Sequence, residues 1–383
     1  MTMNAARYFA NNASPVPATF AASRDPLAFH QYLHGYAPTR LLDATELAVE
    51  LGVARVWLKD ETSRLGLPAF KILGASWAVY RAMEERAGGF ASWDTLDALV
   101  EQIEPLRPLT LAAATDGNHG RAVARMAALF GLSAHIYVPA GTAQARIDGI
   151  ADEGAEVTVV DGTYDEAVAR SAEDAGDRCL VISDTSWPGY EAVPGWVIDG
   201  YSSILWEIDD ELARRSEPGP DLVVVQIGVG ALAAAVVGHY RQPREVTPRI
   251  LGVEPLRAAC MLTSMEAGAI TSIPGPHDSI MAGLNCGEPS MLAWPVVSTG
   301  TDLFLAVDDE RAREGMRLLA TSGVVAGETG AAGLGGLLEA LRGRDSPHLR
   351  ARLNITSNSR VLLFITEGAT DPDAYDEIVG LRS

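Results

Sequence analysis

The sequence predicts an α/β fold in which helices cover both faces of open, twisted sheets of parallel type. Two observations lead to this prediction. Short runs of aliphatic and β-branched residues alternate with longer alanine-rich stretches, and polar or glycine-rich segments follow several of the runs. With 383 residues, 48% of them hydrophobic, the chain can bury a large core. We therefore expect two domains, or one large domain with an insertion.

The expected elements follow one another as strand and helix along the chain. The expected strands are residues 56–59, 111–114, 135–138, 156–160, 180–182, 222–226, 250–253 and 360–365. The expected helices are residues 72–83, 121–130, 164–175, 201–215, 231–240 and 308–322. Segments 83–108 and 343–359 lack clear periodicity, so surface connections or weak helices are expected there.

Charge and cysteine content exclude several kinds of function. Fifty acidic against thirty basic residues give a formal net charge of −20, which repels nucleic-acid phosphates and anionic lipid surfaces alike. No nucleic-acid or membrane partner is therefore expected. Met1–Arg7 is not followed by the apolar run of a signal peptide, so we expect a cytoplasmic protein. Cys179, Cys260 and Cys286 show no ligand spacing, so we expect reduced structural thiols and no metal site.

Lys71 lies where a loop is expected to meet a helix. It follows Leu67–Phe70 and precedes the helix-compatible stretch 72–83. Burial disfavours the charged ammonium, so a lysine carried into an apolar pocket would supply the neutral amine that a Schiff base requires. The alternative is a surface lysine that caps a helix end.

A second loop-to-helix junction reads Thr115-Asp116-Gly117-Asn118-His119-Gly120 and follows the strand expected at 111–114. Its glycines allow the backbone to approach a flat ligand, and Asn118 offers an amide to a phenolate oxygen. The start of a helix also favours negative charge. The alternative is a plain turn with Asn-His at its tip, and His119 is expected to be structural.

The segment Gln226–Ala231 has the pattern of a strand, a glycine turn and a helix start, which presents free backbone amides to a phosphate. It is also close to a dinucleotide fingerprint, with Glu254 placed where a ribose-binding acid would fall. Against a nicotinamide cofactor, Ala233 replaces the third glycine, and Lys71 would have no role.

Two other strand ends carry polar residues. Asp184 follows the strand at 180–182 and, taken alone, suits a helix cap or a turn. Because Asp116 is expected near the same cleft, the two carboxylates together suit recognition of a second substrate ammonium and proton transfer at two carbons. Thr366 follows the last strand and offers a hydroxyl to a pyridine nitrogen. A neutral ring of this kind suits elimination.

Taken together, these segments resemble the tryptophan synthase β-like (type II fold) pyridoxal phosphate enzymes, and among them the diaminopropionate ammonia-lyases, over about residues 36–373. The glycine loop and the Asn-His-Gly element indicate only the superfamily. Asp116, the Asp184-Thr185 segment and the run Met281-Ala282-Gly283-Leu284 are more specific to the ammonia-lyases.

The resemblance implies roles for individual residues. Those expected to hold pyridoxal phosphate are Lys71 (as the Schiff base), Phe70, Asn118, Gly228, Val229, Gly230, Ala231 and Thr366. Asp116 and Asp184 are expected to form an acid-base pair, linked in the family to the handling of both D and L substrates. Residues expected to contact the substrate are Thr115, Asp116, Asp184, Met281 and Ala282.

The implied reaction converts 2,3-diaminopropionate to pyruvate and ammonia through aminoacrylate. The departures at Ala369, Asn285, Ser186 and Pro188 leave open a relative that acts on serine, threonine, hydroxyaspartate or another β-substituted amino acid. A catalytically silent protein that binds the cofactor and senses an amino acid is a further alternative.

The resemblance also implies an architecture. A small α/β domain at residues 85–197 is expected to be inserted into a large domain. Residues 1–84, with Lys71, and 198–383, with the phosphate loop, would form the large domain. The cofactor would lie in the cleft between the domains, and a homodimer, usual in this family, is expected.

Overall fold

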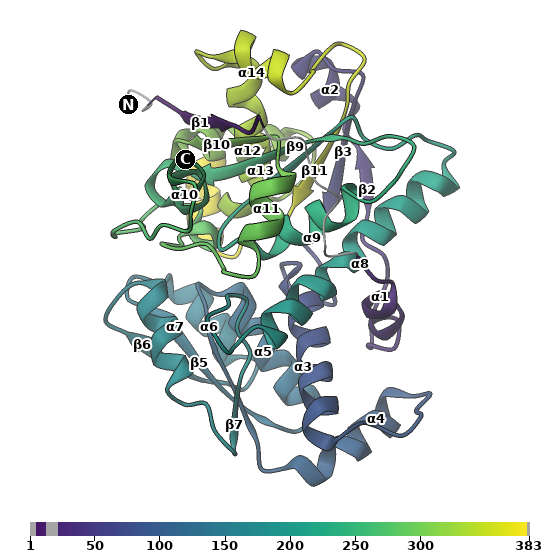
Figure 1. Ribbon diagram of the computed structural model, residues 1–383, viewed down its shortest axis with the longest axis vertical. Coiled ribbons are helices and arrows are strands. Elements are labelled where there is room, and N and C mark those ends of the chain that lie inside the picture. The colour runs from purple at the N-terminus through teal and green to yellow at the C-terminus, as the bar shows by residue number, and fades with distance from the viewer. Residues whose placement is uncertain (1–4, 13–21, 381–383) are drawn as a thin grey trace.

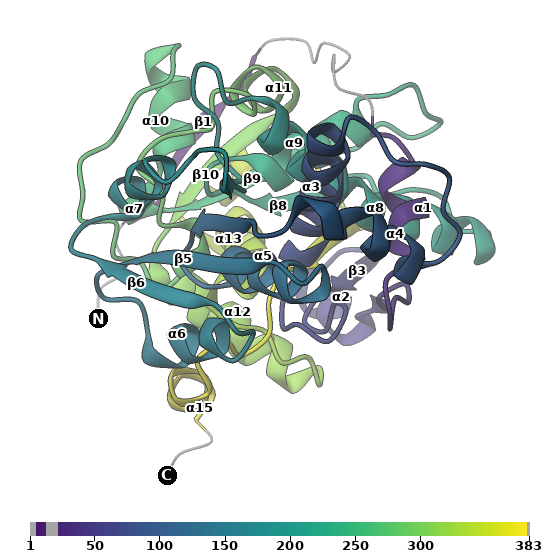
Figure 2. The same ribbon diagram turned by 90° about the horizontal axis from the view of Figure 1, so that it is seen from below.

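Two separate sheets organise the chain in the computed structural model, which describes residues 5–12 and 22–380 (Figure 1). Met1–Asn4, the start of the segment considered above for a signal peptide, lies outside the described residues. Figure 2 shows the same arrangement from the side of the smaller sheet.

The larger sheet has seven strands in the order β1-β10-β9-β8-β11-β3-β2. They are β1 (Arg7–Ala10), β2 (Leu41–Asp43), β3 (Arg55–Asp60), β8 (Leu222–Gln226), β9 (Arg249–Pro255), β10 (Leu303–Val307) and β11 (Arg360–Ile365). The inner strands run parallel, with Leu363 of β11 between Val224 of β8 and Leu58 of β3. The edge strands β1 and β2 are antiparallel to their neighbours.

The smaller sheet has four parallel strands in the order β6-β5-β4-β7. They are β4 (Thr110–Ala114), β5 (Ser133–Pro139), β6 (Glu156–Val160) and β7 (Cys179–Val181). In each sheet, the strands that precede the polar loops are parallel. Their carboxyl ends, and the loops that follow them, therefore lie at one edge of the sheet.

Helices cover the two sheets and connect them. They are α1 (Asp25–His30), α2 (Thr45–Leu51), α3 (Lys71–Ala87), α4 (Leu96–Ile103), α5 (Asn118–Leu129), α6 (Gln144–Ala151), α7 (Tyr164–Ala172), α8 (Ala192–Arg214), α9 (Ala231–Tyr240), α10 (Cys260–Ala267), α11 (Trp294–Gly300), α12 (Asp309–Thr321), α13 (Glu328–Arg342), α14 (Ser346–Arg352) and α15 (Pro372–Val379). Short 3-10 turns lie at Glu104–Leu106, Leu256–Ala258 and Ala282–Leu284. No helix in the described part of the chain is long and apolar enough to cross a membrane.

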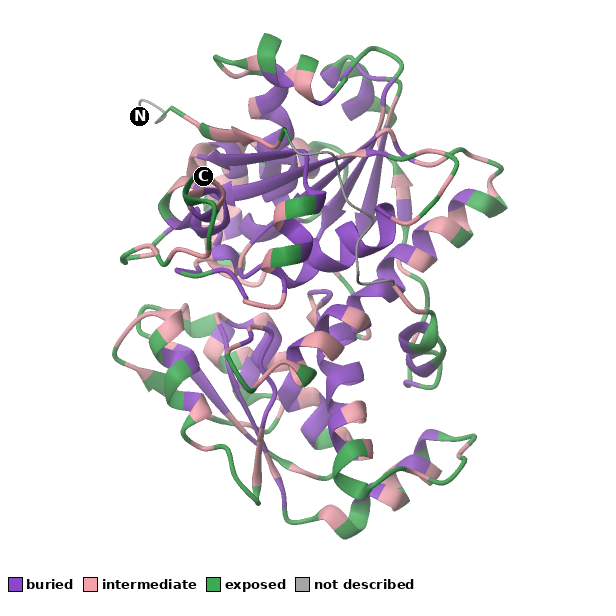
Figure 3. Cartoon of the chain, viewed as in Figure 1, coloured by how far each residue is buried: buried purple, intermediate pink, exposed green. Residues whose placement is uncertain are grey.

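Both faces of the larger sheet are covered. Helix α13 packs on β8, β9, β10 and β11, and α9 packs on β8 and against α8. Every residue of β8 is buried, as expected for a central parallel strand with helices on both sides. The buried residues in Figure 3 follow these strands and the inner faces of the helices.

Helices α3 and α8 cross closely at two glycines. A Cβ added at Gly200 would lie 2.4 Å from the Leu73 carbonyl oxygen, and one added at Gly74 would lie 2.5 Å from the ring of Tyr201. Neither position has room for a side chain. This crossing places the first turn of α3, which carries Lys71, directly against α8.

A buried network of charges ties α8 to the loop that leads into α3. Glu207 of α8 pairs with Lys59 at 2.5 Å and with Arg64 at 2.7 Å, and Arg64 pairs with Glu61 at 2.6 Å. All four side chains are at most 2% exposed. Each charge is hydrogen-bonded to a partner of opposite sign, which is the condition for tolerating burial.

Each predicted strand and helix corresponds to an element of the structure. The elements that the sequence patterns do not predict are β1, β2, β10, α1, α2, α6, α10, α11, α13 and α15. Helices α4 and α14 lie in the two segments where surface connections or weak helices are expected. Helices α5 and α8 begin earlier than predicted, at residues 118 and 192. The small sheet lies within the predicted inserted segment 85–197. The domain boundaries stay a prediction, because residues 84 and 197 fall inside α3 and α8, which pack together.

Replacing His30 with Gln should make the free energy of unfolding less sensitive to acid. Burial, with the charge of Arg64, lowers the pKa of His30 from 6.5 to about 3, so between these values only the unfolded chain binds the proton. The stability contribution is complete above the unfolded pKa and falls as the pH falls. Between pH 7 and pH 5 we expect the unmodified protein to lose about 2 kcal/mol more than His30→Gln in urea unfolding.

His34 is exposed and provides the matched control. His34→Gln should keep the pH dependence of the unmodified protein. An equal pH dependence in His30→Gln and the unmodified protein would contradict the prediction.

Candidate active site

Strand ends from both sheets converge on two connected cavities. The outer cavity has a volume of about 470 Å³, within the range of small-molecule sites. The inner cavity lies between the loops that follow β8 and β11. Lys71, Asp116 and Gly283 line both cavities.

Lys71 is the first residue of α3, and its side chain is 18% exposed. Its Nζ lies 2.6 Å from Oδ2 of Asp184, in the loop after β7. The Tyr164 hydroxyl donates to the other carboxylate oxygen of Asp184 at 2.9 Å. Asp184 is therefore held by partners from α3 and α7.

The ion pair sets the protonation of both groups. Burial lowers the pKa of Lys71, but Asp184, together with Tyr201 and Asp116, outweighs burial and holds the pKa well above its usual value. Burial raises the pKa of Asp184, but Lys71, together with His119 and Tyr164, outweighs burial and holds that pKa well below its usual value. The expectation that burial alone would make the Lys71 amine neutral is therefore wrong for this structure.

The predicted loop after β4 turns tightly. The Thr115 hydroxyl oxygen accepts a hydrogen bond from the Gly117 backbone N–H at 2.8 Å, and Gly117 has a φ of +146°. Asn118 then begins α5 and lines the inner cavity, where its Nδ2 donates to Oε2 of Glu367. Oδ2 of Asp116 is buried without a hydrogen-bond partner within the described residues.

The glycine loop lies at the start of α9. Gly228, Val229, Gly230 and Ala231 all line the inner cavity. The first four N–H groups of an α-helix have no partner within the helix, so this loop offers donors to an anion. A Cβ at Gly228 would lie 3.0 Å from the Gly283 carbonyl oxygen, and Gly230 has a φ of +103°. These two positions therefore favour glycine.

Thr366 lines the inner cavity beyond the end of β11. Its hydroxyl oxygen accepts a hydrogen bond from Nε2 of Gln226 at 2.8 Å. Gln226 also donates to the carbonyl oxygens of Thr329 and Phe364, both at 3.1 Å. Gln226 thus fixes the orientation of the Thr366 hydroxyl.

Of the four remaining predicted residues, two line a cavity and two do not. Phe70 lines the inner cavity, with its ring centroid 4.7 Å from that of Tyr201, and Ala282 lines the outer cavity. Thr115 and Met281 are buried and line neither cavity. The Thr115 hydroxyl serves the local turn, and Met281 packs in the core. A substrate contact from either side chain is therefore not supported.

Glu254 ends β9, where a ribose-binding acid was considered. Its two carboxyl oxygens accept backbone N–H groups of Met261 and Leu262, each at 2.8 Å, in the first turn of α10. The side chain is completely buried, and burial raises its pKa to about 8. Glu254 therefore caps α10 and is not available to a nicotinamide ribose.

Several side chains at the site were not predicted from the sequence. They are Arg146, Tyr164, Tyr201, Gln226 and Glu367. Gln226 carries a signal, because it is the polar end of an otherwise apolar strand next to the glycine loop. The others lie in helices or after a strand without a pattern that sets them apart.

Comparison with known proteins decides the family. The sequence matches the family described as pyridoxal-phosphate dependent enzyme over residues 32–366. The chain belongs to this family. It is also 38% identical over 371 residues to diaminopropionate ammonia-lyase of Salmonella typhimurium, with 92% of this chain and 90% of the relative covered.

Solved structures agree with the sequence comparison. Diaminopropionate ammonia lyase from Escherichia coli in complex with D-serine has a TM-score of 0.89 and 34% identity, covering 99% of this chain and 97% of that chain. The same enzyme in complex with an aminoacrylate-PLP azomethine reaction intermediate has a TM-score of 0.84 and 34% identity, covering 98% and 96%. These matches confirm the predicted fold class, the pyridoxal phosphate cofactor and the resemblance to diaminopropionate ammonia-lyase.

The inner cavity fits the cofactor of this family. The glycine loop has backbone amides of the kind that bind a phosphate, and Lys71 has a primary amine, the group that covalent attachment requires. Asn118 and Thr366 also line the cavity, and their amide and hydroxyl are the kinds of group that a ring hydroxyl and a ring nitrogen can pair with. Gly283 approaches Gly228 closely, and a Cβ at Gly228 would disturb this contact.

Replacing Gly230 with Ala should weaken cofactor binding. The left-handed backbone strains an alanine by about 1–2 kcal/mol, and its Cβ would lie 3.0 Å from Cε of Met261 and 3.1 Å from Cβ of Ala293. We expect the dissociation constant of pyridoxal phosphate to rise about tenfold, measured by absorbance titration.

Gly219 has open space around the position of a Cβ and provides the control. Gly219→Ala should bind the cofactor like the unmodified protein. Unchanged affinity in Gly230→Ala would argue against the phosphate role of the loop.

Proposed function

We propose that this protein catalyses α,β-elimination of 2,3-diaminopropionate, as the D or L isomer, to pyruvate and ammonia. One observation carries the proposal: two carboxylates, Asp116 and Asp184, flank the Lys71 amine at the junction of the cofactor cavity and the outer cavity. The relatives named diaminopropionate ammonia-lyase support this choice of substrate.

Bound pyridoxal phosphate supplies an electron sink for the pair of electrons left at the α-carbon when its proton is removed. The chain's own residues hold the substrate and move protons. Asp184 is ionised and can accept a proton, and the Lys71 ammonium, 2.6 Å from it, can donate one to the leaving β-amine. Free 2-aminoacrylate then reacts with water to give pyruvate and a second ammonia.

We assign the individual residues on the same grounds. The residues proposed to hold the cofactor are Lys71, Phe70, Asn118, Gly228, Val229, Gly230, Ala231 and Thr366. Those proposed to face the substrate are Asp116, Asp184 and Ala282. The neutral hydroxyl of Thr366, fixed by Gln226, suits elimination because it leaves the ring nitrogen unprotonated.

Two of the four departures noted in the sequence, Asn285 and Ser186, have structural roles near the site. Both polar atoms of the Asn285 side chain bond to the Ser279 backbone, at 3.2 and 2.8 Å. The Ser186 hydroxyl lies 2.8 Å from that of Ser290 and accepts from the Leu292 N–H. Both side chains hold loops at the outer cavity and leave the proposed chemistry to Lys71 and the aspartates.

Pyruvate release from purified protein with added pyridoxal phosphate tests the proposal. D- and L-2,3-diaminopropionate, L-serine, L-threonine and hydroxyaspartate are offered in parallel. We expect diaminopropionate to react best and Lys71→Ala to lower its turnover by at least about 1,000-fold. Faster turnover of another amino acid would favour a dehydratase or a related lyase, and cofactor binding without any turnover would favour a sensor.

Asp116→Asn and Asp184→Asn should change the preference for the two isomers in opposite directions. The carboxylates project from different loops, so each should serve one face of the α-carbon. We expect each variant to lower kcat/KM for one isomer by about 100-fold and to affect the other less. Separate kinetics with D and L substrate check this, and an equal loss for both isomers in both variants would contradict it.

We also propose that the protein is a cytoplasmic homodimer. The support is the family resemblance for the dimer and the acidic, reduced character of the sequence for the compartment. Light scattering of the purified holoenzyme would test the dimer, and fractionation of the source cells would test the compartment.

A further inference from the structure

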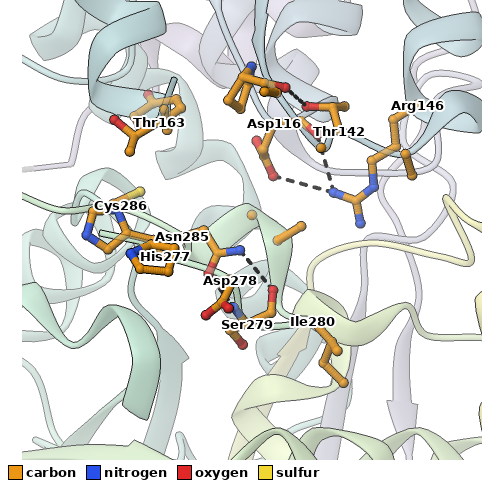
Figure 4. A pocket seen from close by; sticks show the side chains of 18 of the residues that line it. Asp116, Thr142, Arg146, Thr163, His277, Asp278, Ser279, Ile280, Asn285 and Cys286 are labelled. Atoms are coloured by element: carbon orange, nitrogen blue, oxygen red, sulfur yellow. Dashed lines mark hydrogen bonds and ion pairs between the residues drawn. The ribbon is translucent and has the colours of Figure 1, made fainter. Parts of the chain in front are cut away.

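Arg146 on α6 is a buried guanidinium for which the roles above give no explanation. Its side chain is 6% exposed and lines the outer cavity. Within the described residues it makes one hydrogen bond, from Nη1 to the Asp116 carbonyl oxygen at 3.4 Å. Its Nη1 is also 3.6 Å from Oδ2 of Asp116, and Figure 4 shows the guanidinium directed at this residue.

Glu367 extends this contact to the cofactor side of the site. Nη2 of Arg146 lies 3.7 Å from Oε1 of Glu367, which is 1% exposed. Oε2 of Glu367 accepts the hydrogen bond from Asn118, and Oε1 accepts the Thr329 N–H at 3.2 Å. One cation therefore lies between the carboxylate that faces the substrate and the carboxylate that holds the Asn118 amide.

The stem of Arg146 also packs on the loop itself. Between Asp116 and Asn118 lies Gly117, where an added Cβ would be 3.2 Å from Cδ of Arg146. Asp116 lies in the loop after β4 of the small sheet and Asn118 begins α5 directly after it, whereas Glu367 follows β11 in the large sheet. Arg146 thus contacts both sides of the cleft.

Without Arg146, Glu367, which is 1% exposed, and Asp116, which is 20% exposed but has a buried Oδ2, would be two carboxylates without a cation between them. Like charges in one buried site repel, and removing the cation from such a group leaves uncompensated charge. Lys71 cannot substitute for Arg146, because it is paired with Asp184 at 2.6 Å. A dedicated cation is therefore needed on the side of Asp116.

We propose that Arg146 is a positioning residue that fixes Asp116 and Asn118 as one unit, through direct contact with Asp116 and through Glu367. The consequence for catalysis rests on the proposed function of Asp116, and the consequence for the cofactor rests on Asn118. A positioning role predicts that loss of Arg146 disturbs the cofactor and the chemical step together.

The test compares Arg146→Gln, Arg146→Lys and the control Arg121→Gln in the holoenzyme. Arg121 pairs with Glu153 at 3.1 Å and lines neither cavity. Arg146→Gln should lower kcat/KM about 10- to 100-fold, mainly through kcat, because the reacting groups are displaced.

Cofactor affinity provides the readout that needs no substrate. The dissociation constant of pyridoxal phosphate should rise about tenfold in Arg146→Gln, as when a partner that orients a ligand-holding residue is removed. Arg146→Lys keeps the charge and should recover part of both effects even if Arg146→Gln folds poorly. Arg121→Gln should match the unmodified protein.

Two results would overturn the inference. A rise in KM alone, with kcat and cofactor affinity unchanged, would mean that the guanidinium binds the substrate carboxylate directly. Unchanged affinity and kinetics in Arg146→Gln would remove any role. If the unmodified protein does not act on diaminopropionate, the proposed function fails, while the affinity comparison still supports or overturns the role of Arg146.

Discussion

The buried charges of Lys59, Glu61, Arg64 and Glu207 are the constraint on which the position of the site depends. Removing one partner of such a group costs about 3–5 kcal/mol, because the remaining charge is left uncompensated. The network leaves α8 little freedom relative to the loop after β3. That loop leads directly into α3, and the glycine contact between α3 and α8 then fixes where the amine of Lys71 can reach.

The same principle of paired charges operates inside the site. Asp184 is balanced by Lys71, whereas Asp116 and Glu367 face Arg146. The two aspartates are therefore electrostatically distinct although both lie beside the cavity. If Lys71 loses its charge, Asp184 is affected most, because Lys71 lies 2.6 Å from it. Asp116 still has its own cation, because its contact with Arg146 does not involve Lys71. Two carboxylates with separate partners can serve two different proton transfers.

The sequence predicts most of the inner strands because their burial on both faces requires continuous apolar runs, as in Leu222–Gln226. Strand β10 is an exception, since Leu303–Val307 is equally apolar and buried but is not among the predicted strands. Strands β1 and β2 are short and lie at the edges of the sheet. Each pairs with one other strand, β1 with β10 and β2 with β3, so local sequence patterns do not reveal them. Helix α13 contains four glycines, which weaken helix propensity. The structure explains them: a Cβ at Gly336 would lie 2.3 Å from Val253, and one at Gly330 would lie 2.3 Å from the Glu367 carbonyl oxygen.

The loops of the site are predictable because parallel strands end at one edge, which brings Asp116, the glycine loop and Thr366 together. The residues that pair with these loops are not predictable from the sequence. An arginine or a glutamate within a helix or after a strand gains its role only from contacts across the cleft. Lys71 shows the same limit for charge. Burial alone favours a neutral amine, yet a carboxylate 2.6 Å away reverses that effect. Protonation in this site therefore follows from distances between distant segments, which composition and local pattern do not contain.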